Sequence, residues 1–223
     1  MIFAAGFGTR MKHLTRSTPK PMIPVAGTPL IDRALTMVEA THPPRIVIIL
    51  HYQPNVLEAH LAGRKVVTTL REAPDILETG GGLRNARPLL GSDPVITVNP
   101  DVVWAGPNPI TLALQAWNPD RMDALLMCVP MARVRGRAEA GDFDLDDQGR
   151  LQRGGDLVYG GVQVMKTERL HDVPDAAFSL NVVWNDMARV GRLHGITYPG
   201  HWCDVGRPEG IAIAEDMLRQ HDV

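Results

Sequence analysis

The sequence predicts an α/β fold with a mixed, mostly parallel sheet flanked by helices and a small antiparallel subregion. Apolar runs alternate with helically periodic segments up to about residue 130, which is typical of β–α–β units. Glycine, aspartate and arginine then dominate residues 133–156, and residues 146–149 have the composition of a hairpin turn. A length of 223 residues fits one domain with an inserted subregion, so we expect residues 1–223 to form a single domain.

The elements follow from local composition. Thr28 can cap a helix that has Pro29 at its first position and a row of apolar residues on one face. Ligands of parallel sheets bind beyond the carboxyl ends of the strands, so we expect the chemistry just after Ala5, Leu70 and Asn99. The expected strands are 2–5, 45–50, 65–70, 94–99, 123–129, 158–165 and 193–198, with a short one near Phe143. The expected helices are 29–40, 54–61, 81–90, 110–117, 179–190 and 208–220.

Charge and composition exclude several classes of function. A net charge of −2 gives no electrostatic reason to expect nucleic acid or an anionic membrane as a partner. No apolar run has the length that spans a bilayer, and the N-terminus does not resemble a targeting signal. The two cysteines, Cys128 and Cys203, lie far apart and form no C-x-x-C pair, which argues against a zinc ribbon and favours a reducing, cytoplasmic setting.

A glycine-rich loop follows the first expected strand. Gly6 and Gly8 allow a sharp turn with exposed N–H groups, and Arg10 can bind two phosphate oxygens. Lys20 stands between two prolines that restrict its backbone. A strand ending in a glycine turn before a proline-rich surface loop is the alternative interpretation. The spacing fits neither a dinucleotide-binding fingerprint nor a Walker loop, and no helix is expected to open at this loop.

A second glycine-rich segment, 77–83, follows the third expected strand and opens a helix. A helix start of this kind offers unpaired N–H groups to an anion, although a flexible loop is an alternative interpretation. Asp101 ends the fourth expected strand, where a carboxylate can bind a cation beside phosphates. The alternative there is an Asn-Pro-Asp turn.

The segment 200–208 carries a further carboxylate, Asp204, and it also reads as a strand end before a helix that starts at Pro208. Two aspartates more than 100 residues apart, each at a strand edge, suit Mg²⁺ held by few carboxylates plus phosphates. We interpret His201 as a loop histidine and not as a metal ligand.

Several short motifs, taken together, resemble the signature of the sugar-phosphate nucleotidyltransferases; they lie at residues 4–11, 14–15, 18–21 and 24–30. The segments 77–82 and 140–143 are similar to the subgroup that acts on N-acetylmuramate 1-phosphate with UTP, and 200–206 is similar to the closing motif of the family. The resemblance implies a nucleotide-diphospho-sugar transferase type of fold. It also implies in-line attack of an acceptor phosphate on the α-phosphorus of a nucleoside triphosphate, with release of pyrophosphate.

The resemblance assigns roles to residues of this chain. Arg10, Lys20 and Asp101 would be catalytic, and Asp101 and Asp204 would hold Mg²⁺ as the cofactor. Asp142, Gly161 and Asn181 would bind the sugar 1-phosphate. The nucleotide would be bound by Ala4, Ala5, Gly6, Gly8, Thr9, Arg10, Glu78, Thr79 and Gly80.

Three positions depart from the family pattern: His13 replaces a common proline, Pro100 replaces a usual glycine, and Ser179 stands where the subgroup often has lysine. A mannose-1-phosphate guanylyltransferase, or another sugar-phosphate enzyme, is an alternative, because base choice rests on contacts around Glu72 and Glu78. A more distant alternative is that the chain is a non-catalytic nucleotide-binding module. The sequence indicates no oligomeric state.

Overall fold

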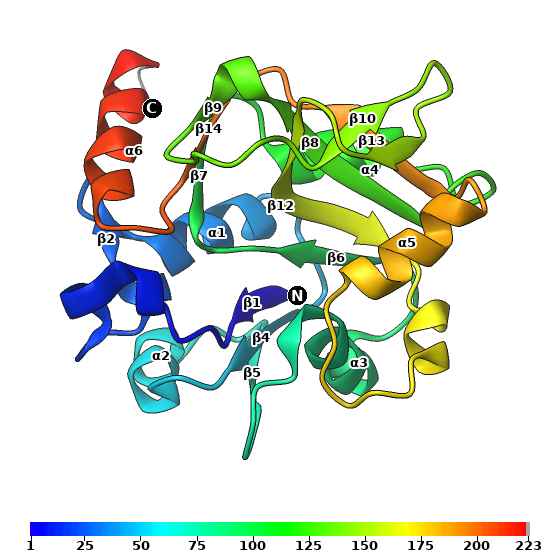
Figure 1. Ribbon diagram of the computed structural model, residues 1–223. Helices are drawn as coiled ribbons and strands as arrows, with labels where there is room; N and C mark the ends of the chain where they lie inside the picture. Colours follow the sequence, from blue (N-terminus) through cyan, green and yellow to red (C-terminus); the bar gives the residue numbers. More distant parts are fainter. Residues whose placement is uncertain (222–223) are drawn as a thin grey trace.

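A computed structural model describes residues 1–221 and is built around one large mixed sheet (Figure 1). The strands of this sheet are β1 (Ile2–Ala4), β4 (Ile46–Leu50), β5 (Val67–Arg71), β6 (Val95–Val98), β8 (Ala124–Pro130), β10 (Phe143–Leu145), β11 (Leu151–Arg153), β12 (Leu157–Met165) and β13 (Leu193–Thr197). Their order is β11-β10-β12-β6-β1-β4-β5, and β8 pairs with both β12 and β13. The predicted α/β class is confirmed.

One half of the sheet is parallel and is covered on both faces. β6, β1, β4 and β5 run parallel, with Ile2 opposite Ile48 and Val98 on its two neighbours. All five residues of β4 are buried, as expected for a strand between two layers of helices. Along β4, Ile46, Ile48 and Leu50 join one core cluster, whereas Val47 and Ile49 join another. This alternation places β4 at the centre of the core.

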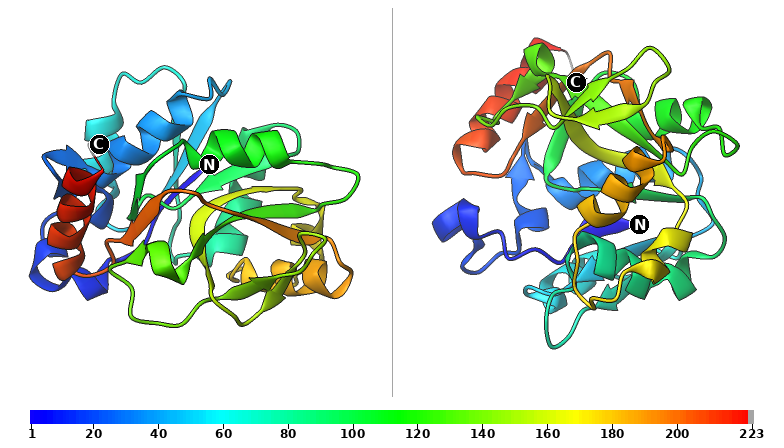
Figure 2. Two further views of the ribbon diagram at one scale, coloured as in Figure 1. Left: turned by 90° about the horizontal axis from the view of Figure 1, so that it is seen from above. Right: turned by 45° about the vertical axis from the view of Figure 1, so that its right-hand side comes forward.

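The helices divide between the two faces. The core cluster on one face takes its apolar side chains from α1, α2 and α4, and the cluster on the other face takes them from α3 and α5. Figure 2 shows α5 lying above α3 on the same side of the sheet, with the segment 168–178 beside them. The α-helices are α1 (Leu30–Glu39), α2 (Pro54–Leu61), α3 (Glu78–Leu90), α4 (Pro109–Ala116), α5 (Asn181–Arg189) and α6 (Glu209–Gln220). The 3₁₀ helices are η1 (Thr9–Thr15), η2 (Lys20–Met22), η3 (Met131–Arg133) and η4 (Glu168–Asp172).

The antiparallel strands belong to the same sheet. β12 runs antiparallel to β6 and β8, and β10 and β11 form the expected hairpin around 146–149. Asp146 closes that turn, because its Oδ1 accepts from the backbone N–H of Gln148 and Arg150 at 2.9 Å. A smaller sheet joins β7 (Val102–Ala105), β14 (His201–Asp204) and β9 (Val134–Arg135), and β2 (Pro24–Val25) pairs with β3 (Thr28–Pro29).

Several boundaries differ from the sequence prediction. Thr28 and Pro29 lie in β3 and do not open a helix, because Pro29 pairs with Pro24 in extended geometry; α1 begins at Leu30. β5 begins at Val67, since a turn between Arg64 and Val67 takes up the residues before it. A 3₁₀ helix follows Gly8, where none was expected. The short strands β7 and β9 were missed, because each is too short to show a periodic pattern. For β14, the sequence predicted only a strand end near Asp204 and placed His201 in a loop.

The segment that contains β2 lies beside the last helix, α6, on one side of the molecule. The backbone N–H of Ala26 donates to the Glu215 carboxylate on α6 at 2.9 Å, and α6 packs beside β2 (Figure 2). Among residues 1–221, none of the helices has the length and apolar character needed to cross a bilayer.

The Asp123 carboxylate is a structural centre away from the cavities. It accepts from Arg169 and Arg192 at 3.0 Å and is 13% exposed. Burial acts to raise the pKa of Asp123, but the two guanidinium groups outweigh it, and the pKa lies below its usual value. We expect Asp123→Asn to lower the free energy of unfolding by about 2 kcal/mol, because Arg169, Arg192 and the more distant Lys166 lose their partner.

The measurement is urea unfolding as a function of pH. The contribution of Asp123 is complete above the pKa of the unfolded chain, about 3.9, and is lost as the pH falls below it. The difference between wild type and Asp123→Asn should therefore shrink below about pH 4. Asp186→Asn, which removes a surface partner of Arg189 on α5, is the matched control and should change stability by less than about 0.5 kcal/mol. Equal effects of the two substitutions on stability would contradict the structural role of Asp123.

Candidate active site

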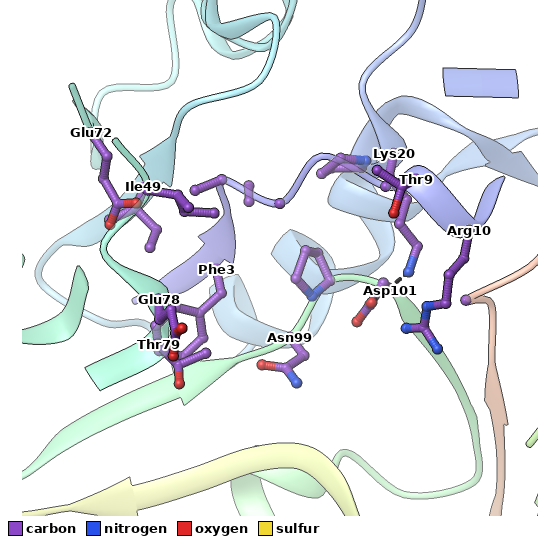
Figure 3. Close-up of a pocket in the computed structure, with 18 residues that line it drawn as sticks. Phe3, Thr9, Arg10, Lys20, Ile49, Glu72, Glu78, Thr79, Asn99 and Asp101 are labelled. Carbon is purple, nitrogen blue, oxygen red and sulfur yellow. Dashed lines mark hydrogen bonds and ion pairs between the residues drawn. The ribbon is translucent and has the colours of Figure 1, made fainter. Parts of the chain in front are cut away.

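Two contiguous cavities open at the carboxyl ends of β1, β5 and β6, where the sequence predicted the chemistry. Arg10, Asn99 and Asp101 line both of them, so the cavities meet at these residues. The first cavity, of about 310 Å³, is also lined by Ala4, Ala5, Gly6, Gly8, Thr9, Lys20, Glu72, Glu78 and Thr79 (Figure 3). The second, of about 350 Å³, is also lined by Arg137, Asp142, Phe143, Arg153, Gly161, Asn181, Trp184 and Asp204.

The loop after β1 is shaped by Gly8. Its φ of 64° lies in the left-handed region, and a Cβ there would stand 2.9 Å from the Cβ of Lys20, so only glycine fits. The Gly8 carbonyl accepts from the Met11 N–H at 2.8 Å and from the Thr15 hydroxyl at 3.1 Å, which fixes the start of η1. A Cβ on Gly6 would have no atom within 4 Å, so the absence of a side chain there leaves space in the cavity open.

Lys20 and Asp101 form an ion pair where the two cavities meet. Lys20 Nζ lies 2.5 Å from Asp101 Oδ2, and the Lys20 side chain is only 10% exposed (Figure 3). Burial acts to raise the pKa of Asp101, but the ammonium of Lys20 and, more weakly, the guanidinium of Arg10 outweigh it and lower that pKa. Asp101 is therefore an ionised carboxylate at neutral pH.

Asp204 is brought beside Asp101 by backbone pairing. Antiparallel pairing of β7 and β14 sets Asp204 opposite Val102, and the Val205 N–H donates to the Asp101 carbonyl at 3.0 Å. Burial raises the pKa of Asp204, and the negative charge of Asp101 raises it further. Two aspartates that are far apart in sequence thus share one small volume and repel each other.

The two aspartates fit a small, hard cation. Residues 1–221 contain no group of three or more His, Cys, Asp or Glu side chains that could hold a metal. Mg²⁺ commonly takes only one or two carboxylates from the protein and the remaining oxygens from phosphates and water. The repulsion between Asp101 and Asp204 is the observation that favours a cation, because a positive charge between them would relieve it.

The far end of the first cavity is acidic. In Figure 3, Glu72, Glu78 and Thr79 lie on one side of Asn99, and Lys20, Arg10 and Asp101 lie on the other. Glu72 is 4% exposed, and its Oε2 accepts from the Leu77 N–H at 3.0 Å. Its Oε1 is buried and has no hydrogen-bond partner within residues 1–221, and burial raises the pKa of this carboxyl. Glu72 therefore carries an unsatisfied buried acceptor in a side chain that lines the first cavity.

The three glycines of α3 serve close packing. A Cβ on Gly80 would lie 2.3 Å from the Phe178 ring, one on Gly81 would lie 2.3 Å from the Ala176 carbonyl, and one on Gly82 would lie 2.5 Å from Glu72 Oε1. The Gly80 and Gly81 N–H groups both donate to the Phe178 carbonyl, so the expectation that they are unpaired is wrong. Gly80 lies outside the lining of the first cavity, unlike the other residues predicted to bind nucleotide.

The three residues predicted to bind the acceptor all line the second cavity. Asp142 accepts from Arg137 Nη2 at 2.7 Å and from the Tyr159 N–H at 2.9 Å, so both of its oxygens are engaged. Gly161, with φ 93°, forms a bulge in β12 whose carbonyl accepts from the Asn99 N–H at 2.8 Å. Asn181 Oδ1 accepts from Arg153 Nη2 at 2.8 Å.

Sequence reasoning missed two cavity arginines, Arg137 and Arg153. Both come from the stretch 133–156, which is rich in arginine, and nothing in its pattern distinguishes a cavity arginine from a surface one. His201 is the first residue of β14 and not a loop residue; it lies outside the lining of both cavities and stacks on His221 with ring centroids 4.0 Å apart.

Comparisons with known proteins find relatives of this chain along nearly its whole length. An N-acetylmuramate alpha-1-phosphate uridylyltransferase of Caulobacter vibrioides is 37% identical, over 99% of this chain and 96% of the relative. A protein of the same name from Neisseria meningitidis serogroup B is 33% identical over 92% of each chain. The solved inositol-1-phosphate CTP transferase of T. maritima superposes with a TM-score of 0.79 at 15% identity, covering 97% of this chain and 94% of that one, which shows a shared fold.

The MobA-like NTP transferase domain matches residues 1–139, which include the glycine loop, Lys20 and Asp101. With more than half of the chain matched and a near-full-length relative above 30% identity, the chain belongs to the MobA-like NTP transferase family.

Proposed function

We propose that this chain is a Mg²⁺-dependent nucleotidyltransferase that joins a nucleoside triphosphate, preferably UTP, to a sugar 1-phosphate, preferably N-acetylmuramate 1-phosphate. The products are the nucleoside diphosphate sugar and pyrophosphate. The observation that carries the proposal is the meeting of Arg10, Lys20, Asp101 and Asp204 where the two cavities join. The names of the Caulobacter and Neisseria relatives support the choice of substrates.

The proposed reaction needs charge control and positioning more than covalent chemistry. Arg10 and the amides of the glycine loop would hold the departing pyrophosphate. Lys20 would move its ammonium from Asp101 toward the α-phosphate and the acceptor oxygen as negative charge gathers there. Asp101 and Asp204 would hold Mg²⁺, which when bound supplies Lewis-acid neutralisation of the phosphate oxygens.

Glu72 supports a base that carries an imino N–H. A carboxylate is only an acceptor when it is ionised. Glu72 lines the first cavity, and its buried Oε1 has no partner within residues 1–221. Uracil, thymine and guanine present an N–H on the edge that pairs with other bases, whereas cytosine and adenine present a ring-nitrogen acceptor there. An ionised Glu72 would therefore favour UTP, dTTP or GTP over CTP and ATP, and the names of the relatives favour UTP.

We further propose that residues 1–223 act as one nucleotidyltransferase domain, because residues from Phe3 to Gly206 line the first cavity. Both cysteines are free and buried, which supports a reducing, cytoplasmic location. A role in peptidoglycan recycling would follow from the use of N-acetylmuramate 1-phosphate as acceptor. The binding partners of the protein would be small molecules, and they would include neither nucleic acid nor a membrane.

The function is tested by pyrophosphate release with purified protein, Mg²⁺ and N-acetylmuramate 1-phosphate, with UTP, dTTP, GTP and CTP compared in parallel. We expect release with UTP at the highest kcat/KM and none above background with CTP. Preference for GTP with mannose 1-phosphate would replace the proposal by a guanylyltransferase. Nucleotide binding without release for any sugar phosphate would indicate a non-catalytic binding module.

Lys20→Ala should lower kcat by about 10²-fold, since removal of one preorganised charge costs about 3 kcal/mol at the transition state. KM for UTP should change less than kcat. Lys65→Ala, at an exposed lysine outside both cavities, is the matched control and should leave kcat unchanged. A kcat of Lys20→Ala within about threefold of wild type would contradict the catalytic role.

Asp204→Asn should raise the Mg²⁺ concentration needed for half-maximal pyrophosphate release by about tenfold or more, because one anionic ligand is lost. The measurement is a Mg²⁺ titration at saturating UTP and acceptor. Asp156→Asn, at an exposed aspartate outside both cavities, should follow the wild-type curve. An unchanged curve for Asp204→Asn would exclude Asp204 as a ligand.

A further inference from the structure

Two guanidinium groups in the second cavity have no carboxylate partner. Within residues 1–221, no carboxylate oxygen lies within 4.0 Å of Arg10 or Arg153. Arg137, by contrast, pairs with Asp142 at 2.7 Å. The proposed chemistry uses Arg10 for phosphate and has no role for Arg153. A cation that lines a cavity without a direct ion-pair partner is a feature of anion-binding sites.

Arg153 is held in place by neutral groups. It is the last residue of β11, and its Nε donates to Asn185 Oδ1 at 2.9 Å and its Nη2 to Asn181 Oδ1 at 2.8 Å. Its guanidinium carbon lies 4.6 Å from the centroid of the Phe143 ring. Both asparagines belong to α5, which lies beside the β10–β11 hairpin (Figure 1). These contacts orient the guanidinium, and the nearest charge that acts on it, Asp142, forms no direct ion pair with it.

The donors of Arg153 are only partly used. A guanidinium carries five N–H donors, and two of those on Arg153 are engaged by protein within residues 1–221. Structural arginines of this chain are bound differently. Arg84 donates to four main-chain carbonyls, and Arg192 donates to Asp123 and to three carbonyls. Arg153 thus keeps a free fork of donors, which matches the two oxygens of a carboxylate.

The position of Arg153 sets it apart from the reacting centre. Arg153 ends β11 and Asp101 follows β6, and β10 and β12 lie between these two strands. Three strand spacings correspond to about 14 Å between the strand axes, and long side chains shorten the gap. Both residues nevertheless line the same cavity. An acceptor whose phosphate lies at Asp101 can therefore present a second group to Arg153.

We propose that Arg153 binds a carboxylate of the acceptor that is separate from its phosphate, and so determines which sugar phosphate is used. This assignment rests on the proposed function. In N-acetylmuramate 1-phosphate the lactyl ether on the sugar carries such a carboxylate, whereas N-acetylglucosamine 1-phosphate has a hydroxyl at that position and is otherwise the same. Asn181 and Asn185 are then positioning residues for Arg153.

The test compares both acceptors with UTP in wild type and Arg153→Gln, by steady-state pyrophosphate release. For N-acetylmuramate 1-phosphate we expect kcat/KM to fall about 10- to 100-fold, mainly through KM, because charge-assisted hydrogen bonds to a carboxylate are lost. For N-acetylglucosamine 1-phosphate kcat/KM should stay within about twofold, and so should KM for UTP. Arg153→Lys keeps the charge without the fork and should give an intermediate loss for the muramate acceptor.

Arg150→Gln is the matched control. Arg150 lies on the same hairpin outside both cavities and pairs with Asp146 at 2.7 Å, so its loss should change neither acceptor. An equal fall for both acceptors in Arg153→Gln, or an unchanged kcat/KM for the muramate acceptor, would overturn the role of Arg153 alone. Wild-type protein that releases no pyrophosphate with either acceptor would overturn the proposed function and this assignment with it.

Discussion

The contact between the Lys20 ammonium and the Asp101 carboxylate is the interaction around which the rest of the site is arranged. Lys20 passes close to Gly8 on its way to Asp101, and a Cβ on residue 8 would stand too close, 2.9 Å from the Cβ of Lys20. Asp101 is in place because β6 pairs with β1 and because its carbonyl accepts from Val205. The glycine loop, the short helix η2 and the small sheet of β7 and β14 thus converge on one pair of charges. A part-buried ion pair of this kind adds little net stability, so its value lies in placing a movable cation at the point where the two cavities join.

The two cavities are also joined through the start of α3. Thr79 lines the first cavity, and its hydroxyl accepts from the Leu180 N–H at 2.9 Å, one residue before Asn181 of the second cavity. The Phe178 ring packs against Gly80, and the Phe178 carbonyl takes two N–H groups of the same turn. Arg84 fixes the preceding residues through their carbonyls and lies 4.8 Å from the Phe178 ring. Residues that face a nucleotide and residues that face an acceptor are therefore parts of one packed unit, which resists relative displacement.

Strands and helices could be predicted where apolar residues recur in a periodic pattern, and the elements that lack such a pattern could not be predicted. The five apolar residues of β4 and the apolar face of α1 identify those elements locally. β14 has four residues and owes its position to pairing with Val102–Ala105, a contact across about 100 residues that no local pattern carries. In the same way, the Gly8 loop, Lys20 and Asp101 were recognisable from their resemblance to the family motifs, whereas Arg153 depends on a hairpin that folds against α5. The glycines of α3 show the opposite error: their composition suggested free N–H groups, but the folded chain uses these residues for close packing with Phe178 and Ala176.

The charge pattern of the second cavity explains why a polyanion would need a further cation there. Its lining holds four carboxylates, and three of them have a partner: Asp101 with Lys20, Asp142 with Arg137, and Glu139 with Arg207 at 3.6 Å. Within residues 1–221, Asp204 has no cation within 4.0 Å, and its pKa is raised by burial and by Asp101. A phosphate that draws Lys20 away from Asp101 would leave two adjacent carboxylates facing further negative charge. That arrangement is unfavourable at low dielectric unless a divalent cation enters with the phosphates, so the transfer of Lys20 and the binding of Mg²⁺ would be coupled.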